Sequence, residues 1–431
     1  MEKKLILFFF VCATVSLVLV GIFILFHRQT TDIDPILSQD TNPNNLSNNL
    51  VSSFKTAMAQ ADIPKESIFM VDSYSGNSDN LVDVAFENKE NNKKFYMASS
   101  IKPFYLAAYI NLLGIDNLNY KVPFKFAKDA ENKFEIASAV YQNITYGYQQ
   151  DELIMDFIVP YFKDKKGITI IQIFDDLTTD PIFLNYSFSL RDIIKYTLGP
   201  SSNWSLTLIR NDFSLKIFKG DEEKSTSAIE DYLNLFLSQN NQPPLLHINL
   251  STNSKKDKMF NTLPFNEVEY LFNWFYQNKF NLNNDIFELM KLSTEDVSID
   301  PKVNNRSHEI KSIAKDLFTN KKALIMEKSG YIGFDYEAAP GLNIANGWDK
   351  LPQIKNKRIV FFDACAFSRI YLKNGKFVQF NYNISAPVYI SLNPKYEELN
   401  QDYLLVKNNI LNKLNLNLKS VLETYRDNLQ T

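Results

Sequence analysis

The sequence predicts an α+β fold: one antiparallel sheet built from both ends of the domain, flanked by helices, with a helical subdomain between them. The sequence also predicts one N-terminal transmembrane helix before this domain. Three observations support the prediction. Strand-like segments fall at residues 67–86 and again at 323–382, helical patterns fill the residues between them, and an uncharged apolar run opens the chain. Strands and helices that cluster separately along a chain are typical of α+β folds.

The apolar run extends from Leu5 to Phe26, with Lys3 and Lys4 before it and His27-Arg28 after it. A helix of this length can cross a hydrocarbon core of about 30 Å. No small-residue cleavage site follows the run, so we expect an uncleaved anchor over residues 1–28 rather than a signal peptide. Although Arg28 competes with the two lysines in setting orientation, we expect a single-pass protein of the cytoplasmic (inner) membrane. The catalytic domain would then be extracytoplasmic, on the periplasmic side.

Residues 29–47 are rich in Asp, Asn, Thr and Ser and predict a flexible linker. The remainder, 48–431, is expected to be one domain with insertions at 114–186 and 335–356. Its first part predicts a helix, two strands around a turn-rich segment, and a second helix after an extended segment; these are Asn48–Ala61, Ser67–Val71, Leu81–Phe86 and Ser99–Leu113.

The middle of the domain contains clear helix signals. Ser189 with Asp192 predicts a capping-box start for a helix over Leu190–Leu198, which Gly199-Pro200 ends before another helix near Trp204. Pro264 at a first helical turn predicts a helix to about Phe275.

The last third predicts strands and a closing helix. Asn374-Gly375 is the strongest hairpin signal in the chain. The expected elements are the strands Ala323–Ile332, Arg358–Phe362, Phe367–Leu372 and Lys376–Tyr382, and the helix Gln401–Leu422.

Composition excludes several kinds of function. A formal net charge of −3 gives no electrostatic case for a nucleic-acid partner. Cys365 is the only cysteine beyond the apolar run, and we interpret it as a buried strand residue. With so few histidines and cysteines, a zinc site or a Cys–His nucleophile pair is hard to build, so no metal or cofactor is expected.

Ser99-Ser100-Ile101-Lys102 opens an apolar helix and supplies a candidate nucleophile and base. Free backbone N–H groups at a helix start favour a developing oxyanion. Lys102 lies three residues on and shares a helix face with Ser99. A lysine held against apolar walls near a second cation can act as a base. The alternative is that Ser99 is an ordinary N-cap, and the other Ser-x-x-Lys matches, Ser52–Lys55 and Ser312–Lys315, are most simply solvated helix faces.

Two further signals follow in the order that such chemistry requires. Ser201 and Asn203 fall between two helices, where a hydroxyl could relay a proton and an amide could hold substrate; the alternative is a second N-cap. Lys328-Ser329-Gly330 lies on a predicted strand, where Lys328 would be the second cation and Gly330 would permit close approach of a ligand. Taken alone, Lys328 would be an exposed strand lysine.

Together these three signals resemble the active-site motifs of class A β-lactamases and penicillin-binding proteins, a serine β-lactamase-like and D-alanyl transpeptidase-like family. The resemblance covers about Asn48 to the C-terminus. It implies that Ser99 is acylated, that Lys102 is its base and that Ser201 passes the proton to the leaving nitrogen. It further implies that Asn203 orients substrate, that Lys328 and Ser329 hold its carboxylate, and that the N–H groups of Ser99 and Tyr331 form the oxyanion hole.

The sequence also departs from the family pattern. The stretch that matches the family's Ω-loop, Gln239–Leu263, has no glutamate to activate the deacylating water; its only carboxylate, Asp257, is more simply a solvated charge. Ser202 stands where the family usually has Asp. Pro103 disfavours helical geometry at Lys102.

The resemblance therefore predicts a serine hydrolase acylated by a small-molecule β-lactam or by a peptidoglycan stem peptide ending in D-alanine. The missing glutamate favours a penicillin-binding protein or D-alanyl peptidase. Two alternatives stay open: a catalytically silent domain that binds wall peptides or a protein, and an active β-lactamase whose deacylation base comes from elsewhere, such as Glu230.

Overall fold

The computed structural model describes residues 42–77, 94–128, 134–137, 186–199, 201–238, 262–293, 309–318, 323–335, 357–391 and 396–431. All of these belong to one compact unit, Thr41–Thr431. The expected anchor, the expected strand Leu81–Phe86 and much of both insertions lie outside the described residues. Within the described ranges, no helix combines the length and apolar character needed to cross a bilayer.

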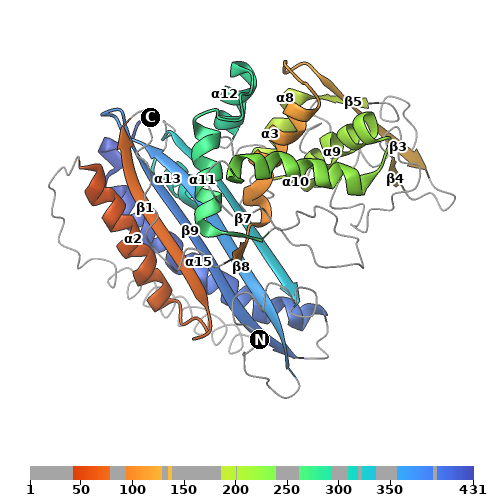
Figure 1. Ribbon diagram of the computed structural model, residues 1–431. Helices are drawn as coiled ribbons and strands as arrows, with labels where there is room; N and C mark the ends of the chain where they lie inside the picture. The colour runs from red at the N-terminus through yellow and green to blue at the C-terminus, as the bar shows by residue number, and fades with distance from the viewer. Residues whose placement is uncertain are drawn as a thin grey trace, which may run out of the picture. The chain divides into compact units, whose positions relative to one another are not determined.

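Four antiparallel strands form the main sheet in the order β1-β9-β8-β7 (Figure 1). Their bounds are β1 Ile68–Asn77, β7 Ile325–Asp335, β8 Lys357–Tyr371 and β9 Lys376–Ser391. Because β1 pairs with β9, segments from both ends of the domain share one sheet, and the predicted arrangement is confirmed. Asn374-Gly375 joins β8 to β9, and Gly375 has the positive φ of 76° that such a turn favours.

The strands are longer than the sequence predicted. β1 continues through the segment expected to be a turn, because Ser73 to Asn77 pair with Phe380 to Lys376 of β9. β8 is a single strand where two were predicted, because Asp363 to Ala366 pair with β7 on one side and β9 on the other. Pairing on both edges overrides a weak local preference.

The sheet has two buried faces of different chemistry. Alternate residues of a strand point to opposite faces. We call the "apolar face" the side that carries Val378, Phe380, Tyr382 and Ile384 of β9, and the "polar face" the side that carries Gln379, Asn381, Asn383 and Ser385. All eight side chains are at most 1 % exposed.

Three helices cover the apolar face: α2 (Pro43–Gln60), α13 (Glu309–Leu317) and α15 (Tyr396–Thr424) (Figure 1). α2 begins five residues before the predicted start, because the Asn42 side chain caps it and Pro43 occupies its first turn. Residues 43–47, expected in the linker, therefore belong to this helix, and Leu46 is fully buried in it.

The helical subdomain packs on the polar face. Its elements are η2 (Ala98–Ile101), α3 (Lys102–Leu112), α8 (Leu190–Leu198), α9 (Asn203–Phe218), α10 (Glu222–Ser238), α11 (Phe265–Tyr276) and α12 (Asn284–Ser293). Short strands accompany it: β2 (Lys94–Tyr96) pairs with β6 (Thr262–Pro264), and β3 (Lys121–Lys128) pairs with both β4 (Phe134–Ala137) and β5 (Tyr186–Ser189). Phe272 of α11 stacks on Phe367 of β8 with ring centroids 4.6 Å apart, so α11 joins the subdomain to the sheet.

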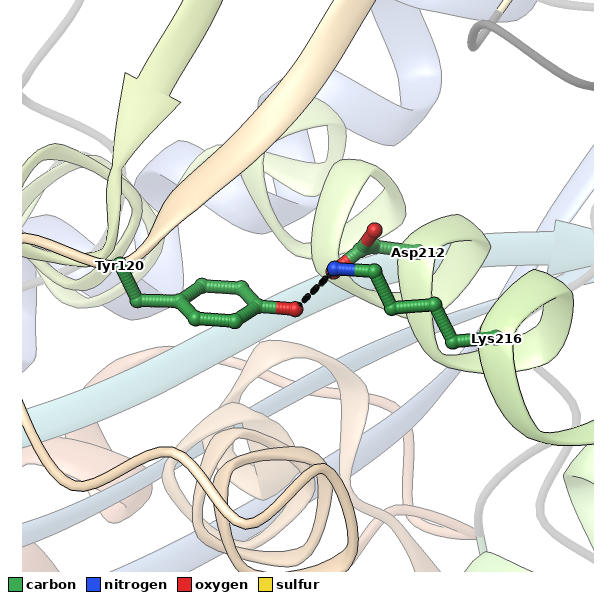
Figure 2. A network of polar contacts seen from close by, with 3 residues as sticks. All are labelled: Tyr120, Asp212 and Lys216. Carbon is green, nitrogen blue, oxygen red and sulfur yellow. Dashed lines mark hydrogen bonds and ion pairs between the residues drawn. The ribbon is translucent and has the colours of Figure 1, made fainter.

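Two predicted helix starts are confirmed. Ser189 and Asp192 form a reciprocal capping box at α8, and Pro264 immediately precedes α11. Farther along α9, Asp212 accepts from the Tyr120 hydroxyl at 2.5 Å and from Lys216 at 2.9 Å, and Lys216 also contacts the Tyr120 hydroxyl (Figure 2). Burial and the bond to Asp212 raise the pKa of the Tyr120 phenol. This network connects α9 to Tyr120, the residue before β3. The first turn of α9 carries Asn203 of the candidate site.

Candidate active site

Ser99 lies in the 3-10 turn η2 and caps no helix. The caps of η2 and α3 are Met97 and Ile101, and neither makes a side-chain cap bond. The interpretation of Ser99 as an ordinary N-cap is therefore wrong. Ala98, just before it, has a φ of 42°, a conformation that a non-glycine residue adopts only when its surroundings enforce it.

Pro103 explains why a 3-10 turn precedes α3. Proline has no N–H to donate to Ser99, so the Lys102 amide bonds the Ser99 carbonyl instead. Lys102 nevertheless has helical angles (φ −55°, ψ −37°), and the geometry that Pro103 was expected to disturb is retained.

The turn and the edge strand β7 meet at Gly330. A Cβ added there would lie 2.5 Å from the Ser99 nitrogen, 2.9 Å from Ala98 Cβ and 3.0 Å from the Ser100 nitrogen. Only glycine permits this approach. The backbone of β7 therefore runs directly against the Ser99 and Ser100 amides of η2.

The loop between α8 and α9 presents Ser201. Ser202 is the N-cap of α9, because its hydroxyl accepts from the Ser205 amide. Ser201 is thus free of the capping role that was its alternative interpretation. Its φ of 64° places it in the left-handed region.

Ser201 bridges the two predicted lysines. Lys328 Nζ donates to Ser201 Oγ at 2.7 Å, Lys102 Nζ donates to the same oxygen at 3.2 Å, and Lys102 also bonds the Ser201 carbonyl. Lys328 is fully buried and Lys102 is 3 % exposed, so Lys328 is not an exposed strand lysine. Burial lowers the pKa of Lys328 to about 7, against smaller opposing effects of Cys365 and Glu327.

The remaining predicted residues are less completely placed. Asn203 is the first residue of α9, and Tyr331 follows Gly330 in β7; the side chains of both lie outside the described part of the chain. Along β7, Ser329 points to the opposite face of the strand from its neighbours Lys328 and Gly330. Its hydroxyl is buried and has no hydrogen-bond partner among the described residues.

Of the two carboxylates considered as a deacylation base, the structure describes only Glu230. Asp257 lies outside the described residues. Glu230 is in α10, where it interacts electrostatically with the buried phenol of Tyr105 on α3.

Cys365 and Ser100 lie behind the turn, and sequence reasoning assigned neither of them a functional role. Cys365 is buried, as expected, and its Sγ is 3.3 Å from the Met97 carbonyl oxygen and 3.4 Å from Ser100 Oγ. Ser100 donates to the same carbonyl at 2.6 Å. Burial raises the pKa of the Cys365 thiol to about 12, so it stays protonated. In the sequence, only the second serine directly after Ser99 could have drawn attention to this contact.

Hydrogen bonds join two amines, on α3 and β7, through the Ser201 hydroxyl of the α8–α9 loop, beside the turn η2 that bears the candidate nucleophile Ser99. Such a set can take a proton from an attacking hydroxyl and return it to a leaving group.

Comparison with known proteins gives a distant structural similarity. No protein-family model and no curated protein matches the chain. Among solved structures, the chain is similar to the TLA-1 extended-spectrum β-lactamase (14 % identity, TM-score 0.44, 88 % of this chain and 99 % of that one). It is also similar to a β-lactamase from Chitinophaga pinensis (11 %, 0.45, 87 % and 98 %). A third is a single-site mutant of PBP-A, solved as an acyl-enzyme complex with penicillin G (11 %, 0.38, 85 % and 96 %).

Proposed function

We propose that this chain is a serine acyl-transfer hydrolase that β-lactams or D-alanyl peptides acylate at Ser99. We further propose that an N-terminal helix holds it in the cytoplasmic membrane with the domain outside the cytoplasm. The observation that carries the proposal is the Ser201 hydroxyl, which accepts from both Lys102 and Lys328 beside the turn that bears Ser99. Isolated motif matches would not bring two buried lysines to one hydroxyl.

In the proposed reaction, Ser99 Oγ attacks the carbonyl carbon of the scissile amide while its proton passes to Lys102. The N–H groups of Ser99 and Tyr331 stabilise the oxyanion, and each such donor typically contributes about 3 kcal/mol. The carbon–nitrogen bond then breaks, and the proton reaches the leaving nitrogen through Ser201 Oγ. Water later adds to the ester, releasing the acid and restoring Ser99.

Carboxylate recognition falls to Lys328 and Ser329 in this proposal. The motif resemblance alone assigns Ser329 to this role, because the register of β7 places Ser329 beside Ala366 and Tyr382, on the face opposite Lys328. Because residues 239–263 contain no glutamate, we propose slow release of the acyl group, as in a penicillin-binding protein.

The test is intact-protein mass spectrometry of the full-length chain after exposure to penicillin. Wild type should gain the mass of one penicillin, and Ser99→Ala should not. Ser52→Ala is the matched control, because Ser52–Lys55 on α2 repeats the motif on an exposed position and should keep the adduct.

No adduct on wild type, or an adduct on Ser99→Ala, would refute the proposal. Saturable peptide binding that Ser99→Ala leaves unchanged would then favour the silent binding domain. Rapid nitrocefin turnover would instead identify an active β-lactamase with a base from elsewhere.

A further inference from the structure

The position of Ser201 depends on a backbone conformation that serine does not favour. Its φ of 64° is typical of glycine, and a non-glycine residue held there costs on the order of 1 kcal/mol. Such a conformation persists only where neighbouring contacts enforce it. For Ser201 the conformation matters, because it aims one hydroxyl at two lysine amines.

The contacts that enforce it act on the next residue, Ser202. Its N–H donates to the Tyr196 carbonyl at 2.9 Å. Its carbonyl accepts from Ser205 Oγ at 3.2 Å, and its hydroxyl accepts from the Ser205 amide at 3.3 Å. With amide, carbonyl and hydroxyl all bonded, Ser202 fixes the peptide that follows Ser201.

A second hydroxyl completes the arrangement from α8. Thr197 Oγ1 and Ser205 Oγ are 2.6 Å apart, and both side chains are fully buried. Ser205 has one hydroxyl hydrogen, which it gives to the Ser202 carbonyl, so Thr197 must be the donor to Ser205. The hydrogen bonds therefore run in one direction, from Thr197 to Ser205 to Ser202.

We propose that Thr197 and Ser205, acting through Ser202, are positioning residues that hold the Ser201 hydroxyl between Lys102 and Lys328. The inference rests on the proposed acyl transfer and adds two residues to its site. The contacts that do this are neutral hydroxyl groups. Without it, the left-handed residue relaxes and proton relay slows.

Thr197→Val removes the donor at nearly constant shape, and Thr197→Ser retains it. We expect Thr197→Val to slow penicillin acylation about tenfold to a hundredfold, since small misplacements of reacting groups have effects of this size. The dissociation constant should stay within about twofold, because binding does not use the relay. Thr197→Ser should recover the rate.

The deciding measurement repeats Thr197→Val in a Ser201→Ala background. If Thr197 acts through Ser201, the second substitution should add nothing to the loss already caused by the first. An equal loss in both backgrounds, or no loss in either, would overturn the inference. Should Thr197→Val fail to fold, Ser205→Ala tests the same chain, because its amide still bonds Ser202.

Failure of the two proposals looks different. Absence of any adduct on wild type refutes the acyl-transfer function and this inference with it. Acylation of wild type at a rate that neither Thr197→Val nor Ser205→Ala changes refutes this inference alone.

Discussion

On β9, equally buried side chains make different kinds of contact on the two faces of the sheet. Those of the apolar face pack in one hydrophobic cluster with α2, α13 and α15. Those of the polar face hydrogen-bond across strands and to the subdomain: Arg369 donates to Gln379, Gln379 to Asn381, and Asn381 to Glu269 of α11, at 3.1, 2.8 and 2.8 Å. Equal burial therefore accompanies two kinds of contact, hydrophobic packing on one face and hydrogen bonding on the other.

The polar face is also incompletely satisfied. Asp363 Oδ2 and both amide atoms of Asn383 are buried without hydrogen-bond partners among the described residues. Each such atom costs about 1–3 kcal/mol. The same face receives the turn that carries Ser99, since Cys365 of β8 contacts Met97.

Of the substitutions that compare the two faces, Gly330→Ala should slow acylation most, because η2 and β7 meet at Gly330. A methyl group 2.5 Å from the Ser99 nitrogen forces one backbone away. We expect acylation to fall by about 10²–10³, comparable to the loss of an oxyanion-hole donor. Time-resolved mass spectrometry of the penicillin adduct measures this. An unchanged rate in the folded variant would mean that the close approach has no role in the reaction.

Ile384→Ala should lower stability and leave the acylation rate unchanged. Ile384 is fully buried on the apolar face, so its truncation should reduce the free energy of unfolding by about 2–5 kcal/mol. The acylation rate, measured well below the melting temperature, should not change. Urea unfolding checks the first part. A parallel loss of rate would show that the two faces are not functionally separate.

Asp363→Asn tests the polar face through pH. Burial raises the pKa of Asp363 to about 8, against the opposing bond from Ser385. Between about pH 4 and pH 8 the native state keeps a proton that the unfolded state has released. The carboxyl therefore makes stability fall with rising pH by about 1.4 kcal/mol per pH unit at most, and the fall ends above pH 8.

Asparagine does not titrate, so this contribution disappears in the variant. The difference in free energy of unfolding, variant minus wild type, should rise from pH 4 to pH 8 and then level. Other titrating groups cancel in that difference. A flat difference would show that Asp363 ionises normally in the folded protein.

Local signals in the sequence predicted several elements well. Asn374-Gly375, the Ser189–Asp192 capping box and Pro264 each act within a few residues, and each stands where predicted. The order of the three site motifs was also sufficient to nominate Ser99, Lys102, Ser201 and Lys328, three of which the structure joins by hydrogen bonds.

Other features depended on partners distant in sequence. Gln379, Asn381 and Asn383 alternate with apolar residues, a pattern that normally predicts a solvated face. They are buried because α11 and the turn at Ser99, far away in the chain, cover that face. The left-handed Ser201 was equally unpredictable, since no local signal marks a serine for a conformation that tertiary contacts impose.

Of these substitutions, Ser329→Ala should produce the smallest change in free energy, and it tests β7, the edge strand of the main sheet. The buried Ser329 hydroxyl makes no hydrogen bond to a described residue, so removing it should not lower the melting temperature. If that hydroxyl is reserved for a ligand carboxylate, affinity for penicillin should fall by about fivefold to tenfold, the value of one hydrogen bond. The methyl ester of the same penicillin lacks the carboxylate and should bind wild type and variant alike. Equal binding of the free acid by both proteins would leave Lys328 as the carboxylate-binding residue of the pair, with Ser329 serving only the packing of β7.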